Sequence, residues 1–347
     1  MKKILLIGLL VGHTLVAHAE GHDAEVHDTN SFLPSSDNSS PGLPDTDRAQ
    51  LRDGGLTALG TELAGTELWT GLKLEHDQTG PESLKESLKT GPAPRLHSAI
   101  ALIYDQQTQR PLYTKNANAS ASIASITKLM TAMVVLDALQ PLNEEIGIEA
   151  SDIDTLKRTP SRLAVGMKFT RNEMLSLALM ASENRAASAL ARSYPGGTTA
   201  FLAAMNAKAR EIGMDRTRFI DPAGLRGGNV STAQDLVKMV AAAHNYALIH
   251  QYTTATSNSV EGLGGRVLRF INTNPLVRNV GWDIGVSKTG FINEAGRCLV
   301  MEAKINQRSV IIVLLNSWGK RTRIGDANRI KRWMESADTR SRTSPRG

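Results

Sequence analysis

Cysteine, aromatic residues and long apolar runs are all scarce in this sequence. Cys298 is the single cysteine among 347 residues, which excludes an intrachain disulfide. Aromatic residues make up only 4% of the chain, which argues against stacking on nucleic-acid bases. Beyond residue 20 the longest apolar stretch is SVIIVLLN at 309–316, which suits a strand and is too short to span a membrane. We expect Cys298 to be a small core residue, since nothing around it suggests a nearby base.

The N-terminus has the pattern of a secretory signal peptide. Two lysines precede an apolar run that closes on Ala-His-Ala, the small-x-small pattern of a cleavage site. The run is interrupted by histidines and is shorter than a membrane span requires. We therefore expect residues 1–19 to be removed after Ala19 during export.

Charge is distributed unevenly along the chain. Residues 20–93 contain 14 acidic and 5 basic side chains, whereas 94–347 contain 20 acidic and 33 basic ones. The first of these segments is rich in Ser, Gly and Pro and lacks sustained apolar periodicity, so we predict a disordered acidic tether over 20–94. Its role stays open, with recruitment of a protein partner as one possibility. The basic remainder could favour an acidic polymer or an anionic membrane face, or could serve solubility alone.

The pattern after residue 95 predicts a helix-rich middle between strands. HSAIALIYD and PLYTKN, joined by a polar turn, are typical of a hairpin, and VSKTGF, CLVMEAKI and SVIIVLLN are typical of later strands. Helical spacing begins near Ser125, and a Thr170–Glu173 capping box precedes another apolar helix. A last helix is expected at DANRIKRWME. We predict one folded domain over 95–335, with a helical insertion between its first and last strands, and a basic disordered tail over 336–347.

Three short motifs carry the chemistry, and each of them occurs twice. Ser-x-x-Lys begins at Ser125 and Ser317, Ser-x-Asn at Ser36 and Ser182, and Lys-Thr-Gly at Lys89 and Lys288. Taken singly each motif is weak. Only the combination that begins at 125, 182 and 288 runs in the order Ser-x-x-Lys, Ser-x-Asn, Lys-Thr-Gly, and local context favours the same three copies.

With these motifs the sequence resembles the serine D-alanyl-D-alanine peptidases, the low-molecular-mass penicillin-binding proteins, over roughly residues 95–335. Longer stretches support the resemblance: ASITKLMTAMVVLDA, SRLAVGMKFTRNEMLSLALMASENRAASALA, TRFIDPAGL, NVSTAQDLVKMV, NTNPLVR and SKTGF. They look most like the D-alanyl-D-alanine endopeptidase branch. The resemblance implies an α+β, β-lactamase/transpeptidase-like fold, in which an antiparallel sheet is flanked by helices and carries a helical subdomain.

The resemblance also implies a setting and partners. It implies a periplasmic enzyme that acts on peptidoglycan, is acylated by β-lactam antibiotics such as penicillin, and needs neither a metal nor another cofactor. Nucleic acid is not an expected partner, and no membrane span is expected in the mature chain. The chain ends too soon after Lys288 for the C-terminal β domain and amphipathic anchor helix of the carboxypeptidase relatives, so we expect neither.

The first two motifs are assigned catalytic roles. Positions i and i+3 of a helix share one face, so Lys128 can take the proton of Ser125 as the hydroxyl attacks a carbonyl. Lys128 must be neutral for this, and we expect burial and the ammonium of Lys288 to lower its pKa. Ser182 would relay a proton to the leaving amine. Asn184 would steady Lys128 and hydrogen-bond the substrate backbone.

The third motif is assigned to substrate binding. Lys288 and Thr289 on a strand edge can hold a carboxylate, and Gly290 is expected to leave room for substrate to lie alongside as an added strand. By resemblance, the backbone N–H of Phe291 and that of Ser125 form the oxyanion hole.

Three alternatives to an endopeptidase remain open. A D-alanyl-D-alanine carboxypeptidase would use the same residues, because both leaving groups carry a carboxylate beside the scissile amide. A β-lactamase needs a glutamate for deacylation, and Glu144 and Glu145 precede the Ser182 motif, whereas class A enzymes place that residue after it. A wall-binding adaptor that has lost activity conflicts with three intact motifs.

Overall fold

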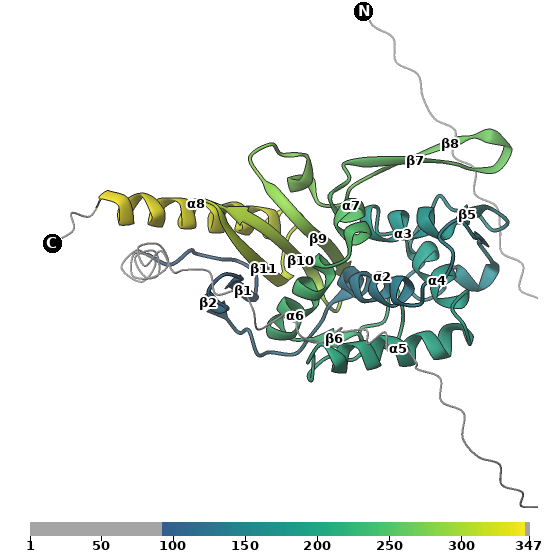
Figure 1. Cartoon of the computed structure of the whole chain (residues 1–347), viewed down its shortest axis with the longest axis horizontal. Coiled ribbons are helices and arrows are strands. Elements are labelled where there is room, and N and C mark those ends of the chain that lie inside the picture. The colour runs from purple at the N-terminus through teal and green to yellow at the C-terminus, as the bar shows by residue number, and fades with distance from the viewer. Residues whose placement is uncertain (1–91, 344–347) are drawn as a thin grey trace, which may run out of the picture. The chain divides into compact units, whose positions relative to one another are not determined.

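Five antiparallel strands form the central sheet of this computed structural model, which describes residues 92–343. Their order is β2-β1-β11-β10-β9 (Figure 1). The strands are β1 (Ile100–Asp105), β2 (Arg110–Lys115), β9 (Asp283–Ile292), β10 (Gly296–Ile305) and β11 (Arg308–Ser317). The predicted hairpin and the three later strands are thus confirmed. The predicted signal peptide and nearly all of the predicted tether lie outside the described residues.

Both faces of the sheet are buried at its central strands β1, β11 and β10, which explains why these strands show no alternation of apolar and polar residues. Val300 and Val313, paired across β10 and β11, belong to the core beneath the helical subdomain. Their neighbours Leu299 and Leu314, also paired, belong to a second core on the opposite face. Helix α6 (Ala233–His244) packs on the first face and α8 (Thr322–Thr343) on the second (Figure 1). A strand with both sides covered is expected to be apolar throughout.

A helical subdomain is inserted between β2 and β9, as the sequence predicted. It begins where β3 leads into the short 3₁₀ helix η1 and then α2. Its elements are β3 (Ala121–Ser122), η1 (Ala124–Thr127), α2 (Lys128–Asp137), β4 (Glu145–Gly147), η2 (Ala150–Asp152), β5 (Lys168–Thr170), α3 (Arg171–Met180), α4 (Asn184–Arg192), α5 (Gly197–Glu211), β6 (Val230–Ser231), α6, α7 (Ala247–Thr254), β7 (Ser257–Glu261), η3 (Leu263–Gly265), β8 (Val267–Ile271) and η4 (Pro275–Arg278). The Thr170–Glu173 capping box at the start of α3 is present as predicted.

Two parts of the fold differ from expectation. β7 and β8 form a hairpin that the sequence analysis did not assign. Helix α8 continues to Thr343, eight residues beyond the predicted end of the folded domain at 335. The helix extends because its sheet-facing side stays apolar and buried. Met334 is buried against the sheet, and Ala337, one turn further, is buried in the same core. The predicted last helix is thus present and packs on the sheet.

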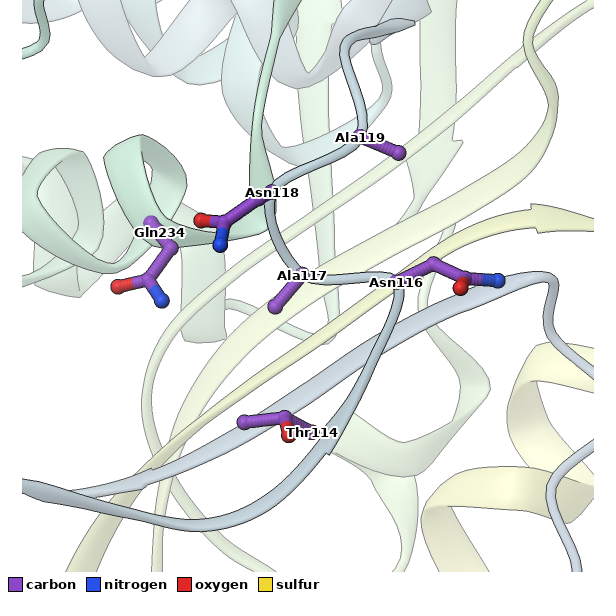
Figure 2. Close-up of a pocket in the computed structure, with 6 residues that line it drawn as sticks. All are labelled: Thr114, Asn116, Ala117, Asn118, Ala119 and Gln234. Carbon is purple, nitrogen blue, oxygen red and sulfur yellow. The ribbon is translucent and has the colours of Figure 1, made fainter.

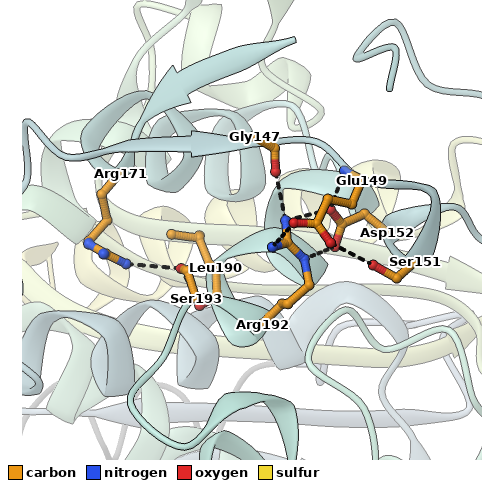
Figure 3. Close-up of polar contacts among 8 residues, drawn as sticks. All are labelled: Gly147, Glu149, Ser151, Asp152, Arg171, Leu190, Arg192 and Ser193. Carbon is orange, nitrogen blue, oxygen red and sulfur yellow. Dashed lines mark hydrogen bonds and ion pairs between the residues drawn. The ribbon is translucent and has the colours of Figure 1, made fainter. Parts of the chain in front are cut away.

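Arginine side chains fix the segment between β4 and α3 against α4. Arg192, in the last turn of α4, donates to the Gly147 carbonyl at 2.6 Å and to the carboxylates of Glu149 and Asp152 (Figure 3). Arg171 is fully buried and pairs with Glu144. Such buried or partly buried charges are tolerated because every one of these groups has a fixed partner. These contacts hold η2 against the last turn of α4, and Arg185 near the other end of the helix donates to the Leu163 carbonyl in the loop that follows η2.

The structure of residues 92–343 bears on two further features, membrane-spanning helices and the single cysteine. Across this described part of the chain, no helix combines the length and apolar character that crossing a bilayer requires. Cys298 is completely buried, and burial raises the pKa of its thiol to about 11. The thiol is therefore protonated at neutral pH and behaves as a core residue, as predicted.

Candidate active site

Ser125 lies in a 3₁₀ turn and not in the first turn of an α-helix. The turn η1 leads directly into α2, whose first residue is Lys128. Side chains three residues apart eclipse one another in a 3₁₀ helix, so the two motif residues face each other more directly than the predicted α-helix would allow. The preceding residue, Ala124, has a left-handed φ of 48°. A non-glycine residue in this region carries a cost of about 1 kcal/mol or more, which other packing must offset.

The Lys128 amine is enclosed by three hydrogen-bonding oxygens. Its Nζ lies 2.9 Å from Ser125 Oγ, 2.7 Å from Asn184 Oδ1 and 2.7 Å from the Ala223 carbonyl. The side chain is fully buried, and burial lowers its pKa to about 7, although the nearby carboxylates of Asp221, Glu183 and Asp154 act in the opposite direction. The predicted lowering by burial is confirmed. At neutral pH a large fraction of Lys128 is therefore an uncharged amine beside the serine hydroxyl.

The second motif lies at the break between α3 and α4. Ser182 has a left-handed φ of 62° and its hydroxyl accepts a hydrogen bond from Lys288 Nζ at 2.8 Å. Asn184 is the first residue of α4 and accepts from Lys128. Ser182 is thus in contact with the third motif and Asn184 with the first. Strained backbone at such a break is common at functional sites, where it aims a side chain.

The third motif occupies the edge strand β9. Lys288 is buried, and its pKa is lowered well below the ordinary value by burial and by the positive charge of Lys128. The repulsion predicted between the two ammoniums therefore acts on Lys288. Thr289 Oγ1 donates to Thr273 Oγ1 at 2.7 Å. Thr273, which the sequence analysis did not select, is tied through its N–H to the carbonyl of Met180 at the end of α3.

Gly290 permits a close approach within the protein itself. A Cβ at this position would lie 3.0 Å from Ala124 Cβ, 3.0 Å from the Ile123 carbonyl oxygen and 3.1 Å from Ser125 N. The absent side chain thus lets β9 approach the turn that carries the nucleophilic hydroxyl, and this approach requires glycine before any substrate is present. Phe291 follows on the same strand, is half exposed, and has Arg297 stacked over its ring. This places the predicted second N–H donor of an oxyanion hole on the strand that approaches Ser125.

A turn at 221–226 supports the nucleophile and was quoted in the sequence analysis only as part of TRFIDPAGL. The Asp221 carboxylate accepts hydrogen bonds from four backbone N–H groups within the turn, those of Ala223, Gly224, Leu225 and Arg226. The turn aims the Ala223 carbonyl at Lys128 and packs Gly224 on the Ala124–Ser125 peptide. A conspicuous Asp-Pro-Ala-Gly turn was the available signal, but Lys128, which its Ala223 carbonyl contacts, lies 95 residues away in sequence, and only the fold reveals the contact.

The duplicate motifs and the rival glutamates have other surroundings. Ser317 ends β11, is buried, and hydrogen-bonds Ser98 at 2.7 Å, so this copy of Ser-x-x-Lys is structural. The copies at Ser36 and Lys89 lie outside the described residues. Glu144 is paired with Arg171 beside α3. Glu144 is thus part of a structural ion pair and is not among the hydrogen-bond partners of Lys128.

A hollow of about 390 Å³ is separate from this cluster. It is lined by Thr114, Asn116, Ala117, Asn118, Ala119 and Gln234. Gln234 comes from the first turn of α6 and the others from the end of β2 and the segment after it (Figure 2). None of the predicted site residues lines it. The candidate active site is therefore identified by the contacts among its motif residues and not by this hollow. Within residues 92–343, no cluster of His, Cys, Asp and Glu has the make-up of a metal site.

The antiparallel sheet, the helical subdomain and the three motifs at their junction define a serine peptidase with a β-lactamase-like fold. A family model described as D-alanyl-D-alanine carboxypeptidase matches residues 87–319, and the chain belongs to this family. It is 48% identical over 242 residues to a Pseudomonas aeruginosa protein named D-alanyl-D-alanine endopeptidase, a match that covers 70% of this chain and 78% of the relative. The identity to the Escherichia coli protein of that name is 45% over 248 residues, covering 71% and 80% of the two chains.

Solved structures give the same fold. The crystal structure of a Streptomyces DD-transpeptidase superposes with a TM-score of 0.66 at 27% identity and covers 71% of this chain and 100% of that one. A D-alanyl-D-alanine carboxypeptidase from Mycobacterium tuberculosis superposes with a TM-score of 0.64 at 26% identity, covering 71% and 94%. The predicted family and fold class are confirmed.

Proposed function

We propose that Ser125 is the nucleophile of an acyl-transfer reaction and that Lys128 is its general base. The observation that carries this proposal is the 2.9 Å contact between Ser125 Oγ and a fully buried Lys128 amine, whose pKa of about 7 leaves it able to accept a proton. Lysine serves as the base for serine in several unrelated hydrolases, provided that its ammonium form is destabilised.

The remaining motif residues supply the other parts of the reaction. The Ser125 oxygen attacks the carbonyl carbon of the D-alanyl residue, its proton passes to Lys128, and the N–H groups of Ser125 and Phe291 stabilise the oxyanion. As the amide C–N bond breaks, Ser182 relays to the leaving amine the proton that Lys128 took from Ser125, so that Lys128 is neutral again, while Lys288 holds the Ser182 hydroxyl by a hydrogen bond of 2.8 Å. Water then hydrolyses the ester of Ser125, with Lys128 as the base once more.

A substrate carboxylate is the natural ligand for the edge of β9. Lys288 Nζ and Thr289 Oγ1 are both polar donors at this edge, and an arriving carboxylate would restore the charged form of Lys288 whose pKa burial has lowered. Asn184 would bind the substrate backbone. Substrates that carry a free carboxylate beside the scissile amide fit this requirement.

We infer that the substrate is cross-linked peptidoglycan and that the enzyme is a D,D-endopeptidase that cleaves D-alanyl-diaminopimelyl cross-links. The chain is 45–48% identical to two proteins named endopeptidases but 32% identical to a Bacillus subtilis protein named a carboxypeptidase. A D-alanyl-D-alanine carboxypeptidase is the second candidate, because the described site residues would serve both reactions.

Cleavage of defined peptidoglycan fragments separates the two candidates. The mature protein and its Ser125→Ala variant would be incubated with cross-linked dimers and with uncross-linked pentapeptides, and the products weighed by mass spectrometry. We expect dimers to yield monomers only with the intact serine. Loss of one terminal alanine from pentapeptides with dimers unchanged would identify a carboxypeptidase, and inertness toward both would overturn the proposed activity.

Acylation by penicillin is expected to depend on pH through Lys128. The base works in its neutral form, so the rate should rise with pH around a midpoint of about 7 and level off above it. Two pH units below the midpoint, the neutral fraction and hence the rate should be about 100-fold lower. Stopped-flow measurement of the acylation rate with a fluorescent penicillin checks this. A rate that is independent of pH, or that falls as pH rises, would exclude neutral Lys128 as the base.

We further propose that the enzyme works in the periplasm, where peptidoglycan is found. The proposal is supported by the lysines, apolar run and Ala-His-Ala sequence before Ala19. The acidic segment 20–94 would act as a tether that recruits a protein partner. Deleting it should leave the hydrolysis of soluble fragments unchanged; a collapse of that rate would show that the segment is part of the catalytic domain.

A further inference from the structure

A hydrogen-bonded chain leads from the loop after η2 to the amine of Lys128. Asp154 Oδ2 accepts from the hydroxyl of Thr159 at 2.7 Å, and Thr159 Oγ1 accepts from Asn184 Nδ2 at 2.8 Å. Asn184 Oδ1 in turn accepts from Lys128 Nζ at 2.7 Å. Neither Thr159 nor Asp154 belongs to the three motifs, and both lie more than twenty residues before Asn184 in sequence.

Asp154 fixes which group donates and which accepts in each hydrogen bond between Asp154, Thr159 and Asn184. Burial alone would raise the pKa of Asp154, but N–H groups of Lys157, Thr159 and Leu156, together with the Thr159 hydroxyl, outweigh burial and lower it. Asp154 is therefore an ionised carboxylate, which can only accept. The single hydroxyl proton of Thr159 is committed to Asp154, so toward Asn184 its oxygen can only accept. This holds the NH₂ group of the Asn184 amide on Thr159 and turns Oδ1 toward Lys128.

The orientation of the amide decides where the Lys128 lone pair lies. A neutral amine has two N–H bonds and one lone pair. Asn184 Oδ1 and the Ala223 carbonyl are both acceptors at 2.7 Å, and together they take the two N–H bonds. The third neighbour is Ser125 Oγ at 2.9 Å, which is then left facing the lone pair. A flipped amide would present NH₂ to Lys128, and the lone pair would be drawn to it and away from the serine.

We propose that Thr159 and Asp154 are positioning residues, which fix the Asn184 amide so that the lone pair of Lys128 points at the Ser125 hydroxyl. The proposal rests on the proposed function of Ser125 and Lys128. The loop is well placed for this task, because Asp154 holds it by backbone N–H groups and Lys157 forms an ion pair with Glu294 in the turn after β9. The loop thereby orients the base without contacting the reacting serine.

The test compares two substitutions of Thr159. Thr159→Val keeps the shape and removes the hydroxyl, whereas Thr159→Ser keeps the hydroxyl and removes a methyl group. We expect Thr159→Val to slow penicillin acylation by about 10- to 100-fold with little change in the noncovalent binding constant, because the base is misaligned. Thr159→Ser should stay within about 3-fold of the wild type, since its hydroxyl can still accept from Asn184. Thermal unfolding confirms that each variant is folded, and Thr159→Ala replaces the valine variant should that one not fold.

The pH profile distinguishes positioning from a merely structural role. Lys128 is faced by the carboxyl groups of Asp221, Glu183 and Asp154 and by the amine of Lys288, and none of these groups is changed. With the amide released in Thr159→Val, the ammonium form loses an acceptor, so the pKa of Lys128 and the acid limb of the profile should move to lower pH. If Thr159 only keeps the loop closed, water would enter and the limb would move to higher pH.

Three results would overturn the proposal: an unchanged acylation rate in Thr159→Val, an equal loss in Thr159→Val and Thr159→Ser, or a limb displaced to higher pH. Failure of the underlying function is distinguishable, because the wild type would then form no adduct on Ser125. The same penicillin serves in both measurements, so the comparison needs no cross-linked substrate.

Discussion

Replacing Lys128 by methionine is expected to lower the rate of acylation by about 1,000-fold or more, since general-base assistance contributes about 10²- to 10⁴-fold and the serine hydroxyl is weak without it. Methionine has a similar length and keeps the buried space filled. The substitution leaves Asn184 Oδ1 and the Ala223 carbonyl without their donor, but it also removes an amine that is costly to bury. The rate of adduct formation with excess penicillin, followed by mass spectrometry, gives the result.

Lys115→Met is the matched control for this variant. Lys115 Nζ also donates to two backbone carbonyls, those of Leu96 at 3.0 Å and Ser98 at 2.9 Å, but it lies at the end of β2, outside the site. Its loss should alter stability through unpaired carbonyls and leave acylation within about 2-fold, as is usual for sites remote from the chemistry. If Lys128→Met kept acylation within about 10-fold of the wild type, Lys128 would not be the base.

Gly224→Ala is expected to destabilise the protein by about 4 kcal/mol or more, in the range reached only by severe backbone or core damage. The added Cβ would lie 1.9 Å from the Ala124 carbonyl oxygen and 2.9 Å from Ser125 N, and the residue already has a φ of +78°. Both contacts are with backbone, which cannot rotate away as a side chain can. The turn must therefore move, and with it the Ala223 carbonyl that holds Lys128. Urea unfolding and the acylation rate are the measurements.

A second glycine isolates the conformational part of this effect. Gly264 has a φ of +67° but no atom within 4 Å of an added Cβ. Gly264→Ala should cost about 1–2 kcal/mol, the penalty of left-handed backbone alone, and leave acylation unchanged. Equal stability losses in the two variants would show that close approach to the nucleophile turn is not what requires glycine at 224.

The sequence predicted those features that local chemistry determines. The order of three motifs selected Ser125, Ser182 and Lys288 from duplicated copies, and the structure brings these three together with Lys128 and Asn184. Helical spacing and capping located α2, α3 and α8, and uninterrupted apolar runs located β10 and β11, because both faces of those strands are covered.

Features set by long-range packing could not be predicted. The left-handed φ of Ala124 belongs to a turn that Gly224 and Gly290 approach closely from two other elements, and no local pattern indicates that approach. The proposed role of Thr159 could not be predicted from the sequence, because it depends on one hydrogen bond to Asn184 from a loop that has no motif of its own. The hairpin β7–β8 was missed although its glycine-rich turn, GLGG, separates two short runs, the usual signal for paired strands.

The pKa of Lys128 was predicted in direction but not in origin. Motif spacing suggested that a second ammonium would help to neutralise it. In the folded chain burial is the largest cause of the lowered pKa, three carboxylates oppose it, and the charge of Lys128 helps to lower the pKa of Lys288 instead. Such a balance depends on distances between residues far apart in sequence, which periodicity does not contain.

Mapping the penicillin adduct tests the central claim most directly. The mature protein would be incubated with penicillin, quenched, digested and sequenced by mass spectrometry, with Ser125→Ala treated in parallel. The account predicts a long-lived adduct on Ser125 and none in the variant. An adduct on Ser182 or elsewhere, an adduct that survives Ser125→Ala, or penicillin turned over rapidly with no adduct accumulating, would contradict a Ser125 acyl-enzyme of a peptidase.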